Sequence, residues 1–208
     1  SILASCKSQM NPHFFYNALN TIQAYIFVND KKKASNYLSK FSKLTRLILE
    51  MSERENISLR EELEALKLYL DLEKMRFSDS FEYEIKVSSD IVQDSVEFPP
   101  MLLQPYVENA VKHGLLHKQG EKSINIKFAR KEDILIVEIE DNGIGRKRSA
   151  ELNAIKNKKH QSFSTQANEK RLEILNEGRK AKIAVEYVDK LSNEGNPLGT
   201  LVRLYIPI

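Results

Sequence analysis

The chain has 208 residues, 41% of them hydrophobic and 29% charged, and its 32 basic and 29 acidic residues leave a net charge of +3. This balance is typical of a globular protein and argues against a nucleic-acid-binding module. Its single cysteine, Cys6, excludes an internal disulfide framework and a cysteine-rich metal site, and favours a reducing compartment. No apolar run approaches the roughly 20 residues of a membrane span. Because the chain begins at Ser1 rather than at methionine, we expect a fragment whose sensor or membrane part lies upstream.

The first third of the sequence has the hydrophobic period of two helices joined by a polar turn at Asn29–Lys31. Apolar residues recur there at spacings of three and four, which predicts an αα-hairpin. The positions are Phe15, Leu19, Ile22 and Ile26, then Ala34, Tyr37, Phe41, Leu44, Ile48 and Met51, with Leu38, Thr45 and Leu49 widening the second stripe. One hairpin cannot bury stripes this broad, so we expect a second copy to complete a four-helix bundle.

A third helix is predicted to begin at Ser58, because Ser58 and Glu61 have the spacing of a capping box. Leucines at 59, 63, 66 and 70 continue its apolar face. The polar residues Ser78–Ser80 end the helix, and we place a domain boundary and a plausible hinge there. The prediction is therefore a helical domain over residues 1–77 and a second domain over residues 78–208.

The second domain alternates strands with helices, which indicates an α+β fold with one sheet and helices on one face. A strand is expected over Phe81–Val87, and a helix from Pro99 and Pro100 to about Leu116. The remaining elements are strands over 124–128 and 134–139, the latter central, a polar basic stretch, a helix from Gln166 to Asn176, and strands over Ile183–Val188 and Thr200–Ile206.

One candidate for chemistry is His13, which shares a helix face with Tyr16 and Asn17, opposite the apolar seam. Either Pro12 kinks a continuous helix, or Asn11 caps a new helix with Pro12 in its first position. In the second case the helix dipole keeps the imidazole neutral and favours an attached phosphoryl anion. Taken alone, the residue is more simply interpreted as an exposed histidine without a role.

A second candidate is the helix around Gln104–Gly114, where Gln104, Glu108, Asn109 and Lys112 cluster on one face. Oxygen donors beside a lysine suit Mg²⁺ and phosphate, and an asparagine has poor propensity for the middle of a helix. The alternative is a solvated helix face.

A third candidate is the segment Asp141–Gly145, which follows a buried strand. The Asp141 carboxylate has the chemistry to accept a hydrogen bond from an adenine amino group, and Gly143 and Gly145 let backbone approach a ligand closely. The alternative is a turn that only ends the strand.

The order of these motifs resembles the LytS-type sensor histidine kinases over nearly the whole chain. The stretches Asn11–Phe14 and Asn17–Asn20 resemble their histidine box, and Gln104–Gly114 resembles the N box of their ATP-binding domain. Further matches are Asp141–Gly145 with the first glycine box, Gly199–Thr200 with the last, and Arg60–Leu63 and Tyr69–Phe77 with the linking helix. The histidine box and N box together are specific, whereas the glycine box is shared with gyrase and Hsp90.

The resemblance implies a dimeric helical phosphoacceptor domain followed by an ATP-binding domain of the gyrase–Hsp90–histidine-kinase type. It implies autophosphorylation with ATP and Mg²⁺, a homodimer, a response-regulator receiver domain as phosphotransfer partner, and a place on the cytoplasmic side of an inner-membrane sensor protein. The implied roles are His13 as phosphoacceptor, Asn17 as orienting residue, Glu108 as polarising carboxylate, Asn109 as Mg²⁺ ligand, Lys112 and His113 at the nucleotide, Asp141 and Thr200 at adenine, and Gly143 and Gly145 lining the pocket.

The sequence departs from that family in two places. The stretch 160–168, where the family often has a second glycine box, contains no glycine, so Thr165 or its neighbouring serines, or Arg171, are expected to serve the phosphates. Phe14 follows the histidine, so His13 has no acidic neighbour in sequence. Two alternatives stay open: a nucleotide-binding regulatory scaffold with little kinase activity, and an ATPase in which Glu108 activates water.

Overall fold

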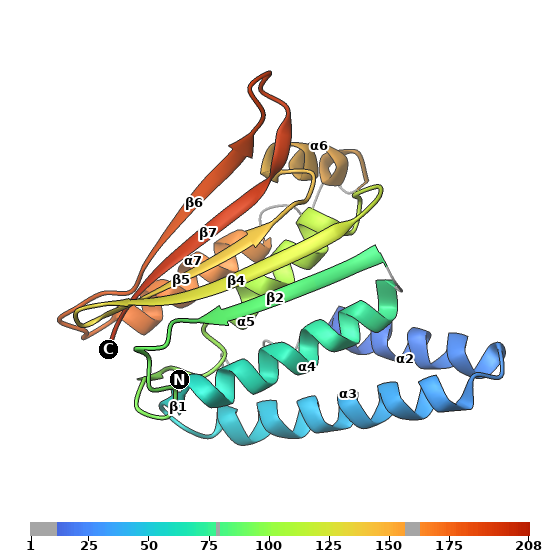
Figure 1. The fold of residues 1–208 in the computed structure, drawn as a ribbon, viewed down its shortest axis with the longest axis horizontal. Helices are drawn as coiled ribbons and strands as arrows, with labels where there is room; N and C mark the ends of the chain where they lie inside the picture. The colour runs from blue at the N-terminus through green and yellow to red at the C-terminus, as the bar shows by residue number, and fades with distance from the viewer. Residues whose placement is uncertain (1–11, 78–79, 157–162) are drawn as a thin grey trace.

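The structure is a computed structural model that describes the backbone of residues 12–77, 80–156 and 163–208 (Figure 1). The side chains of residues 12, 13, 113, 152–156 and 163–167 lie outside the description. The elements in chain order are α2 (Pro12–Phe27), α3 (Lys31–Ser52), β1 (Ile57–Ser58), α4 (Leu59–Phe77), β2 (Phe81–Val87), β3 (Glu97–Phe98), α5 (Gln104–Asn109), the π-helix η2 (Ala110–Leu115), β4 (Lys122–Lys131), β5 (Ile134–Asp141), α6 (Arg146–Lys156), α7 (Phe163–Asn176), β6 (Ala184–Leu191) and β7 (Pro197–Pro207).

Helices α2 and α3 form the predicted hairpin, and the turn between them has a clear local cause. Asn29 adopts a left-handed backbone with φ 58°, a conformation that asparagine tolerates better than most residues. The Asp30 carboxylate then caps α3 by accepting a hydrogen bond of 3.0 Å from the Lys33 backbone N–H. The hairpin is therefore fixed by local chemistry that the polar turn predicted.

The predicted apolar stripes divide into a buried and an exposed part. In α3 five of the six predicted positions are buried, namely Ala34, Tyr37, Leu44, Ile48 and Met51, and Phe41 is half-buried. In α2 the expectation was only partly right, because Leu19 and Ile26 are about 59% and 63% exposed, whereas Ala18 is fully buried. Of the three residues that widen the α3 stripe, Leu38 and Leu49 are each 52% exposed and Thr45 is half-buried. The hairpin thus leaves a second apolar face uncovered.

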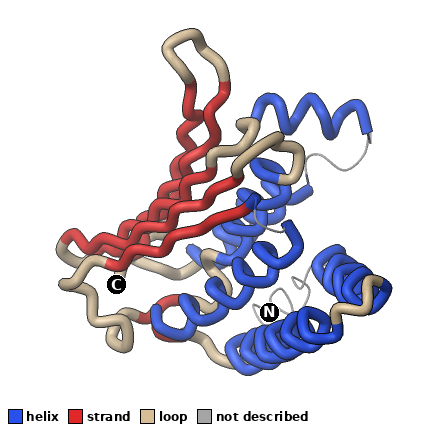
Figure 2. Tube along the Cα trace, turned by 45° about the vertical axis from the view of Figure 1, so that its right-hand side comes forward, coloured by secondary structure: helices blue, strands red, loops and turns tan. Residues whose placement is uncertain are grey.

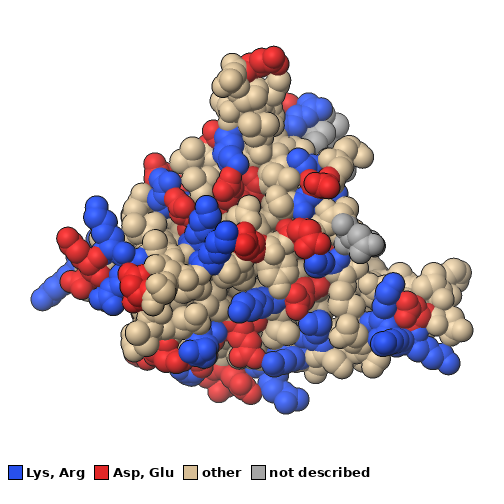
Figure 3. Space-filling view, in the orientation of Figure 1, with Lys and Arg blue, Asp and Glu red and all other residues tan. Residues whose placement is uncertain are grey.

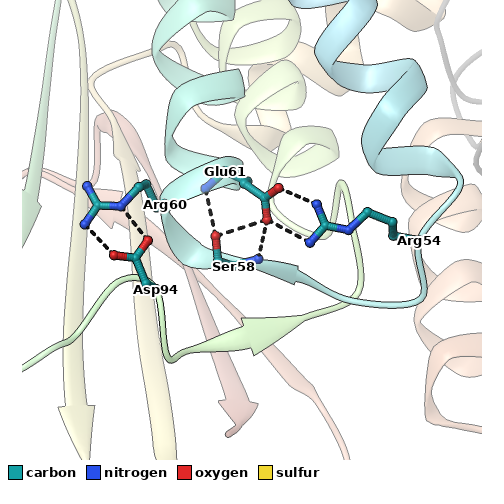
Figure 4. Close-up of polar contacts among 5 residues, drawn as sticks. All are labelled: Arg54, Ser58, Arg60, Glu61 and Asp94. Carbon is teal, nitrogen blue, oxygen red and sulfur yellow. Dashed lines mark hydrogen bonds and ion pairs between the residues drawn. The ribbon is translucent and has the colours of Figure 1, made fainter.

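Helix α4 begins with the predicted capping box (Figure 4). The Ser58 backbone N–H donates to Glu61 Oε2 at 2.9 Å, and the Glu61 backbone N–H donates to Ser58 Oγ at 3.3 Å. Arg54 pairs with the same Glu61 carboxylate, and Arg60 makes a two-fold contact with Asp94 at 2.6 and 2.8 Å. These ion pairs attach the first turn of α4 to the segments on either side of it.

Helix α4 lies between the hairpin and the sheet, as Figure 1 shows, and most of its side chains are buried. Its Asp71 carboxylate pairs with Lys40 of α3 at 2.9 Å and accepts from the Tyr83 hydroxyl of β2. Tyr25 of α2 donates to the Met75 carbonyl at 2.9 Å. A single hydrophobic core runs from α3 through α4 into the sheet. Residues 78 and 79 of the predicted hinge lie outside the described residues, and Ser80 donates to the Phe77 carbonyl at 3.0 Å.

The C-terminal part is a five-stranded sheet in the order β2-β4-β5-β7-β6, with the helices on one face (Figure 2). Strand β2 runs parallel to β4, and the other neighbours are antiparallel. Strand β5 is the central strand, as its dense apolar sequence predicted. Its residues Leu135, Val137 and Ile139 are buried in alternation with more exposed neighbours, which is the pattern of a strand covered on one face.

Three element predictions were wrong in detail. The helix expected from Pro99 begins only at Gln104, because Met101 has φ 58° and cannot continue a helix. Its second half is a π-helix, η2, which no sequence pattern indicated. Helix α6 occupies the stretch expected to be polar and irregular, and α7 begins at Phe163 rather than Gln166.

Acidic and basic side chains are interspersed on the face shown in Figure 3, as the nearly balanced composition requires. Among the described helices, none combines the length and apolarity needed to cross a membrane.

The capping box gives a first prediction. Replacing Ser58 with alanine removes a side-chain acceptor at the start of α4 and should lower the free energy of unfolding by about 1 kcal/mol. Urea denaturation followed by circular dichroism measures this. The matched control is Ser35→Ala on the exposed face of α3, which should be neutral or slightly stabilising because alanine has the higher helix propensity. Equal effects of the two substitutions would contradict the assigned cap.

Candidate functional site

Glu108 occupies a half-buried position on the helix formed by α5 and η2. Its carboxylate accepts a hydrogen bond of 3.1 Å from Gln104 Nε2, one turn earlier. Burial raises the pKa of Glu108 to about 7, and the negative charge of Glu73 acts in the same direction. The Gln104 hydrogen bond and the charges of Lys112 and Arg171 act against that rise in pKa. The sequence expected a polar cluster here, and the structure brings Gln104, Glu108 and Lys112 together.

Asn109 is the last residue of α5, at the point where the helix changes to the wider π-helix η2. Short π-helical segments occur frequently at functional sites. Within the described part of the chain, the Asn109 side chain makes no hydrogen bond, although it is half-buried. Its carboxamide oxygen is a hard donor of the kind that Mg²⁺ prefers, and the exposed Lys112 follows on the same helix. The donor set therefore fits a metal-bound phosphate.

Asp141 ends the central strand β5 and is only 4% exposed. Its Oδ1 accepts a hydrogen bond of 2.8 Å from the Gly143 N–H, and the Thr200 N–H also donates to the carboxylate. Thr200 lies directly opposite on β7. Burial raises the pKa of Asp141 to about 6, while those hydrogen bonds lower it. A buried carboxylate with backbone donors beside it suits recognition of a polar group on a flat heterocycle.

Three chain segments converge on Asp141 so closely that each must present a glycine. A Cβ on Gly114 would lie 2.7 Å from Asp141 Oδ1, and a Cβ on Gly143 would overlap the backbone of Gly114. Gly199 has φ +127°, and a Cβ there would overlap the Asp141 carbonyl oxygen. The Ile144 N–H donates to the Gly114 carbonyl at 3.1 Å. The structure thus joins the end of η2 to both predicted glycine motifs.

The other residues of the Asp141–Gly145 segment shape the turn. Gly145 has φ +78°, which disfavours any other residue, and its carbonyl accepts from the Ser149 N–H at 3.1 Å to start α6. The Asn142 amide bridges Ser123 N and Glu121 O at 2.8 and 3.2 Å. Asn142 is therefore bonded to the start of β4 rather than available to a ligand.

The predicted phosphoacceptor helix meets the α5–η2 helix at a small cavity. His13 lies in the first turn of α2, and Asn17 follows one helical turn later on the same face. Phe14 and Asn17 line a cavity of about 30 Å³ whose opposite wall contains Glu108 and Lys112. That volume is enough for a water molecule. The fold therefore brings two motifs almost one hundred residues apart to one place.

An aromatic cluster attaches α2 beside this cavity. The Phe14 ring lies 5.6 Å from the Tyr69 ring of α4 and 5.7 Å from the Phe41 ring of α3. Such ring pairs add to the energy of apolar burial. The residue that replaces an acidic neighbour of His13 thus anchors the helix.

Sequence reasoning missed the carboxylate that the cavity does contain. Glu73 of α4 is 3% exposed, lines the cavity, and accepts a hydrogen bond of 2.8 Å from Arg76 Nε. Burial raises the pKa of Glu73, and Arg76 lowers it. Both residues belong to the segment Tyr69–Phe77, for which the sequence predicted only a linking helix. The pattern that could have revealed Glu73 is its place at helical spacing from the apolar residues that form the buried face of that helix.

Some predicted residues are placed elsewhere or lie outside the description. Arg171, expected at phosphates, is 7% exposed and donates from Nη2 to the Pro100 carbonyl at 2.9 Å. Its guanidinium is buried against the loop before α5. The side chains of His13, His113 and Thr165 lie outside the described residues, as does Ser162.

Sequence comparisons give one family of known proteins as similar to this chain. A family profile described as "Histidine kinase" matches residues 1–81. The chain is 34% identical over 143 residues to "Sensor protein LytS" of Staphylococcus epidermidis and 35% identical over 143 residues to that of Streptococcus mutans. Each alignment covers 69% of this chain and 24% of the relative, so the chain spans about a quarter of these relatives' length.

A solved structure supports the fold. The histidine kinase domain of the Erythrobacter litoralis EL346 blue-light activated histidine kinase superposes with a TM-score of 0.52 at 11% identity. The superposition covers 92% of this chain and 93% of that domain. The likeness shows a common arrangement of helices and sheet over almost the full length of both.

The glycine convergence gives a second prediction. Gly143→Ala should lower the free energy of unfolding by about 3 kcal/mol, because the new methyl group overlaps the Gly114 backbone, which cannot move aside without shifting Asp141. Urea denaturation measures the loss. The control is Gly178→Ala, which has open space around it and only a positive φ of +74°, so it should cost about 1–2 kcal/mol. A smaller loss at Gly143 than at Gly178 would show that the contact is not tight.

Asp141 gives a third prediction, on pH. Its pKa is about 6 in the fold against an ordinary 3.8, so the folded chain holds this proton more tightly than the unfolded chain. Stability is therefore lost as the pH rises between about 3.8 and 6, and Asp141→Asn removes that loss. The stability of the variant relative to wild type should increase by about 2 kcal/mol from pH 4 to pH 7, measured by urea denaturation without nucleotide. A pH-independent difference would contradict the assignment.

Proposed function

We propose, from the premise that this chain belongs to the histidine kinase family, that it is the catalytic core of a LytS-like sensor kinase. In this proposal the chain autophosphorylates on His13 and passes the phosphoryl group to an aspartate of a response regulator. The observation that carries the proposal is the cavity shared by Asn17, one turn after His13, with Glu108 and Lys112. A phosphoacceptor face and a candidate phosphate-binding helix lie side by side there, as transfer between them requires.

Phosphoryl transfer needs positioning and charge neutralisation more than covalent help from the protein. The neutral imidazole of His13 is a competent nucleophile near neutral pH. Phe14 fixes the helix that carries it through the rings of Tyr69 and Phe41. Asn17, on the same face one turn later, is in position to orient the imidazole, and Glu108 serves as the polarising carboxylate.

ATP would supply the phosphoryl group when bound, and Mg²⁺ would offset its negative charge. On this chain, Asn109 would hold the metal ion, and Lys112 and His113 would lie at the phosphates. Asp141 would read the adenine amino group, with Thr200 beside it and Gly143 and Gly145 lining the pocket. The buried Asp141 carboxylate with its two backbone donors supports this assignment. Thr165 remains a proposed phosphate contact, whereas the burial of Arg171 against Pro100 weakens that role for Arg171.

The uncovered apolar face of the hairpin supports a homodimer. Leu19, Ile26, Leu38 and Leu49 are each more than half exposed on α2 and α3. Exposed apolar rows of this length on paired helices are normally covered by a partner, and a second hairpin completes a four-helix bundle. The receiver domain of a regulator, and an upstream sensor that places this part of the protein on the cytoplasmic side of a membrane, complete the proposal.

The second candidate function is a nucleotide-binding regulatory scaffold with little kinase activity. The observation that favours it is the stretch 160–168, which contains no glycine. The hydrogen bond from Arg171 to the Pro100 carbonyl also favours the scaffold, because it leaves one cation fewer to bind the phosphates. Stable phosphoprotein, free phosphate or neither would separate the kinase, ATPase and scaffold functions.

The kinase proposal makes a fourth prediction. The chain incubated with γ-labelled ATP and Mg²⁺ should acquire a label that is labile in acid and stable in alkali. His13→Ala should abolish the label, and Asn109→Ala should reduce it by about 10–100-fold if it holds the metal. His117→Ala, outside all of the motifs, should label like wild type. Dimerisation is checked first by light scattering.

Each outcome has a distinct meaning. Label that persists in His13→Ala would remove His13 as the phosphoacceptor. Absence of label in a dimeric wild type that still binds ATP by calorimetry would favour the scaffold. Release of inorganic phosphate without a phosphoprotein would favour the ATPase.

A further inference from the structure

A fully buried carboxylate that has no part in the proposed catalysis contacts the segment directly before the α5–η2 helix. Glu62 of α4 is 1% exposed. Its Oε2 accepts a hydrogen bond of 3.0 Å from the Met101 N–H, and its Oε1 accepts one of 3.0 Å from the Leu103 N–H. The Gln104 N–H also interacts with the carboxylate. One side chain thus interacts with three backbone N–H groups of the segment that leads into the site.

This segment needs such a partner. Its chain direction changes at Met101, whose φ of 58° is unfavourable for a residue with a long side chain. The first N–H groups of the following helix have no acceptor within the helix, and Leu103, the residue before it, provides no side-chain cap. The negative charge of Glu62 supplies the acceptors and lies at the positive end of the helix dipole. The start of α5 is therefore defined by a residue of another helix.

Arg171 of α7 holds the same segment from a second direction. It donates from Nη2 to the Pro100 carbonyl at 2.9 Å, within the core. Burial raises the pKa of Glu62, and the three backbone hydrogen bonds and the positive charge of Arg171 lower it. Residues 100–104 are thus bound to an anion from α4 and a cation from α7. Both charges are costly to bury, so their joint presence here indicates a requirement for position rather than for packing alone.

We propose that Glu62 is a positioning residue of the kinase: through the backbone of residues 101–104 it fixes the helix that carries Asn109, and Arg171 ties the same segment to α7. The proposal rests on the proposed function, in which Asn109 holds Mg²⁺. Glu62 touches neither the nucleotide nor the phosphoacceptor in this proposal. It acts as an outer support of a ligand, a class of residue whose loss usually weakens metal affinity.

The first test uses the nucleotide-free chain and Glu62→Gln. Glutamine has nearly the same shape but turns an NH₂ group toward one of the backbone N–H donors, so one charge-assisted hydrogen bond is lost. Backbone amides over residues 103–111 should then exchange with solvent on the order of 10–100-fold faster, while amides of β4 and β5 keep their rates. Hydrogen exchange followed by NMR measures both regions in one sample.

The matched control is Glu61→Gln on the same turn of α4. The Glu61 carboxylate faces Ser58 and Arg54 instead of the α5 segment, so this variant perturbs α4 without touching residues 101–104. It should leave exchange over residues 103–111 at the wild-type rate. Equal acceleration in both variants would overturn the proposal, since it would show a general effect of α4 stability.

The second test measures ATP affinity by calorimetry with Mg²⁺ and with EDTA. Glu62→Gln should reduce the gain in affinity that Mg²⁺ provides by about tenfold, while affinity in EDTA stays near wild type because Asp141 is held by other elements. Glu61→Gln should keep the full gain. An unchanged gain in Glu62→Gln, together with unchanged exchange, would overturn the proposal.

Failure of the proposed function can be distinguished from failure of this proposal. A wild type that binds no ATP would refute the proposed function, and hydrogen exchange alone would then decide the role of Glu62.

If Glu62→Gln does not fold, Arg171→Lys replaces it. That variant keeps the charge but loses the planar group on Pro100, and it should accelerate exchange at residues 101–104. Wild-type exchange at those residues would overturn the link to α7.

Discussion

The burial of α4 on two sides is the constraint on which the rest of the structure depends. Helix α4 packs against the hairpin of α2 and α3 on one side and against β2 of the sheet on the other, with Leu66, Leu70 and Leu72 fully buried. A helix buried on two sides has little freedom to rotate, so the buried polar residues it carries point in fixed directions. For that reason the same helix can direct Glu62 at the start of α5 and Glu73 at the cavity beneath α2.

Four carboxyl groups near the proposed site share one physical condition. Burial raises the pKa of Glu62, Glu73, Glu108 and Asp141 above its ordinary value. Burying a carboxyl group costs folding free energy that an apolar residue would not cost. Groups with shifted pKa values of this kind cluster at functional sites. Their hydrogen-bond partners differ. Glu62 accepts from backbone N–H groups and Glu73 accepts from Arg76, whereas Glu108 and Asp141 keep capacity for a ligand. The first two carboxyl groups are therefore suited to support the structure, and the last two to bind a ligand.

The sequence predicted what depends on local pattern. The hairpin, the capping box and the alternating strands followed from periods of 3.6 and 2, and the central position of β5 followed from its apolar density. The resemblance implied roles for Asp141 and the glycine motifs, whereas the close packing of three glycines around Asp141 needed coordinates. Glu62 could not be found, because its partners lie 39 and 41 residues away and no local pattern encodes them. The π-helix was equally hidden, since it shares its composition with an α-helix.

The attachment of α2 has a consequence for how such a molecule responds to a signal. Among its described side chains only Ala18 is fully buried; the Phe14 ring contacts α3 and α4, and a small cavity lies between this helix and α5–η2. When two arrangements of a protein differ by only a few kcal/mol in free energy, the minor one is measurably populated. A change of tenfold in that equilibrium requires only about 1.4 kcal/mol from outside. The ring contacts of Phe14 with Tyr69 and Phe41 are therefore the place where a displacement of α2 would be passed on to α3 and α4.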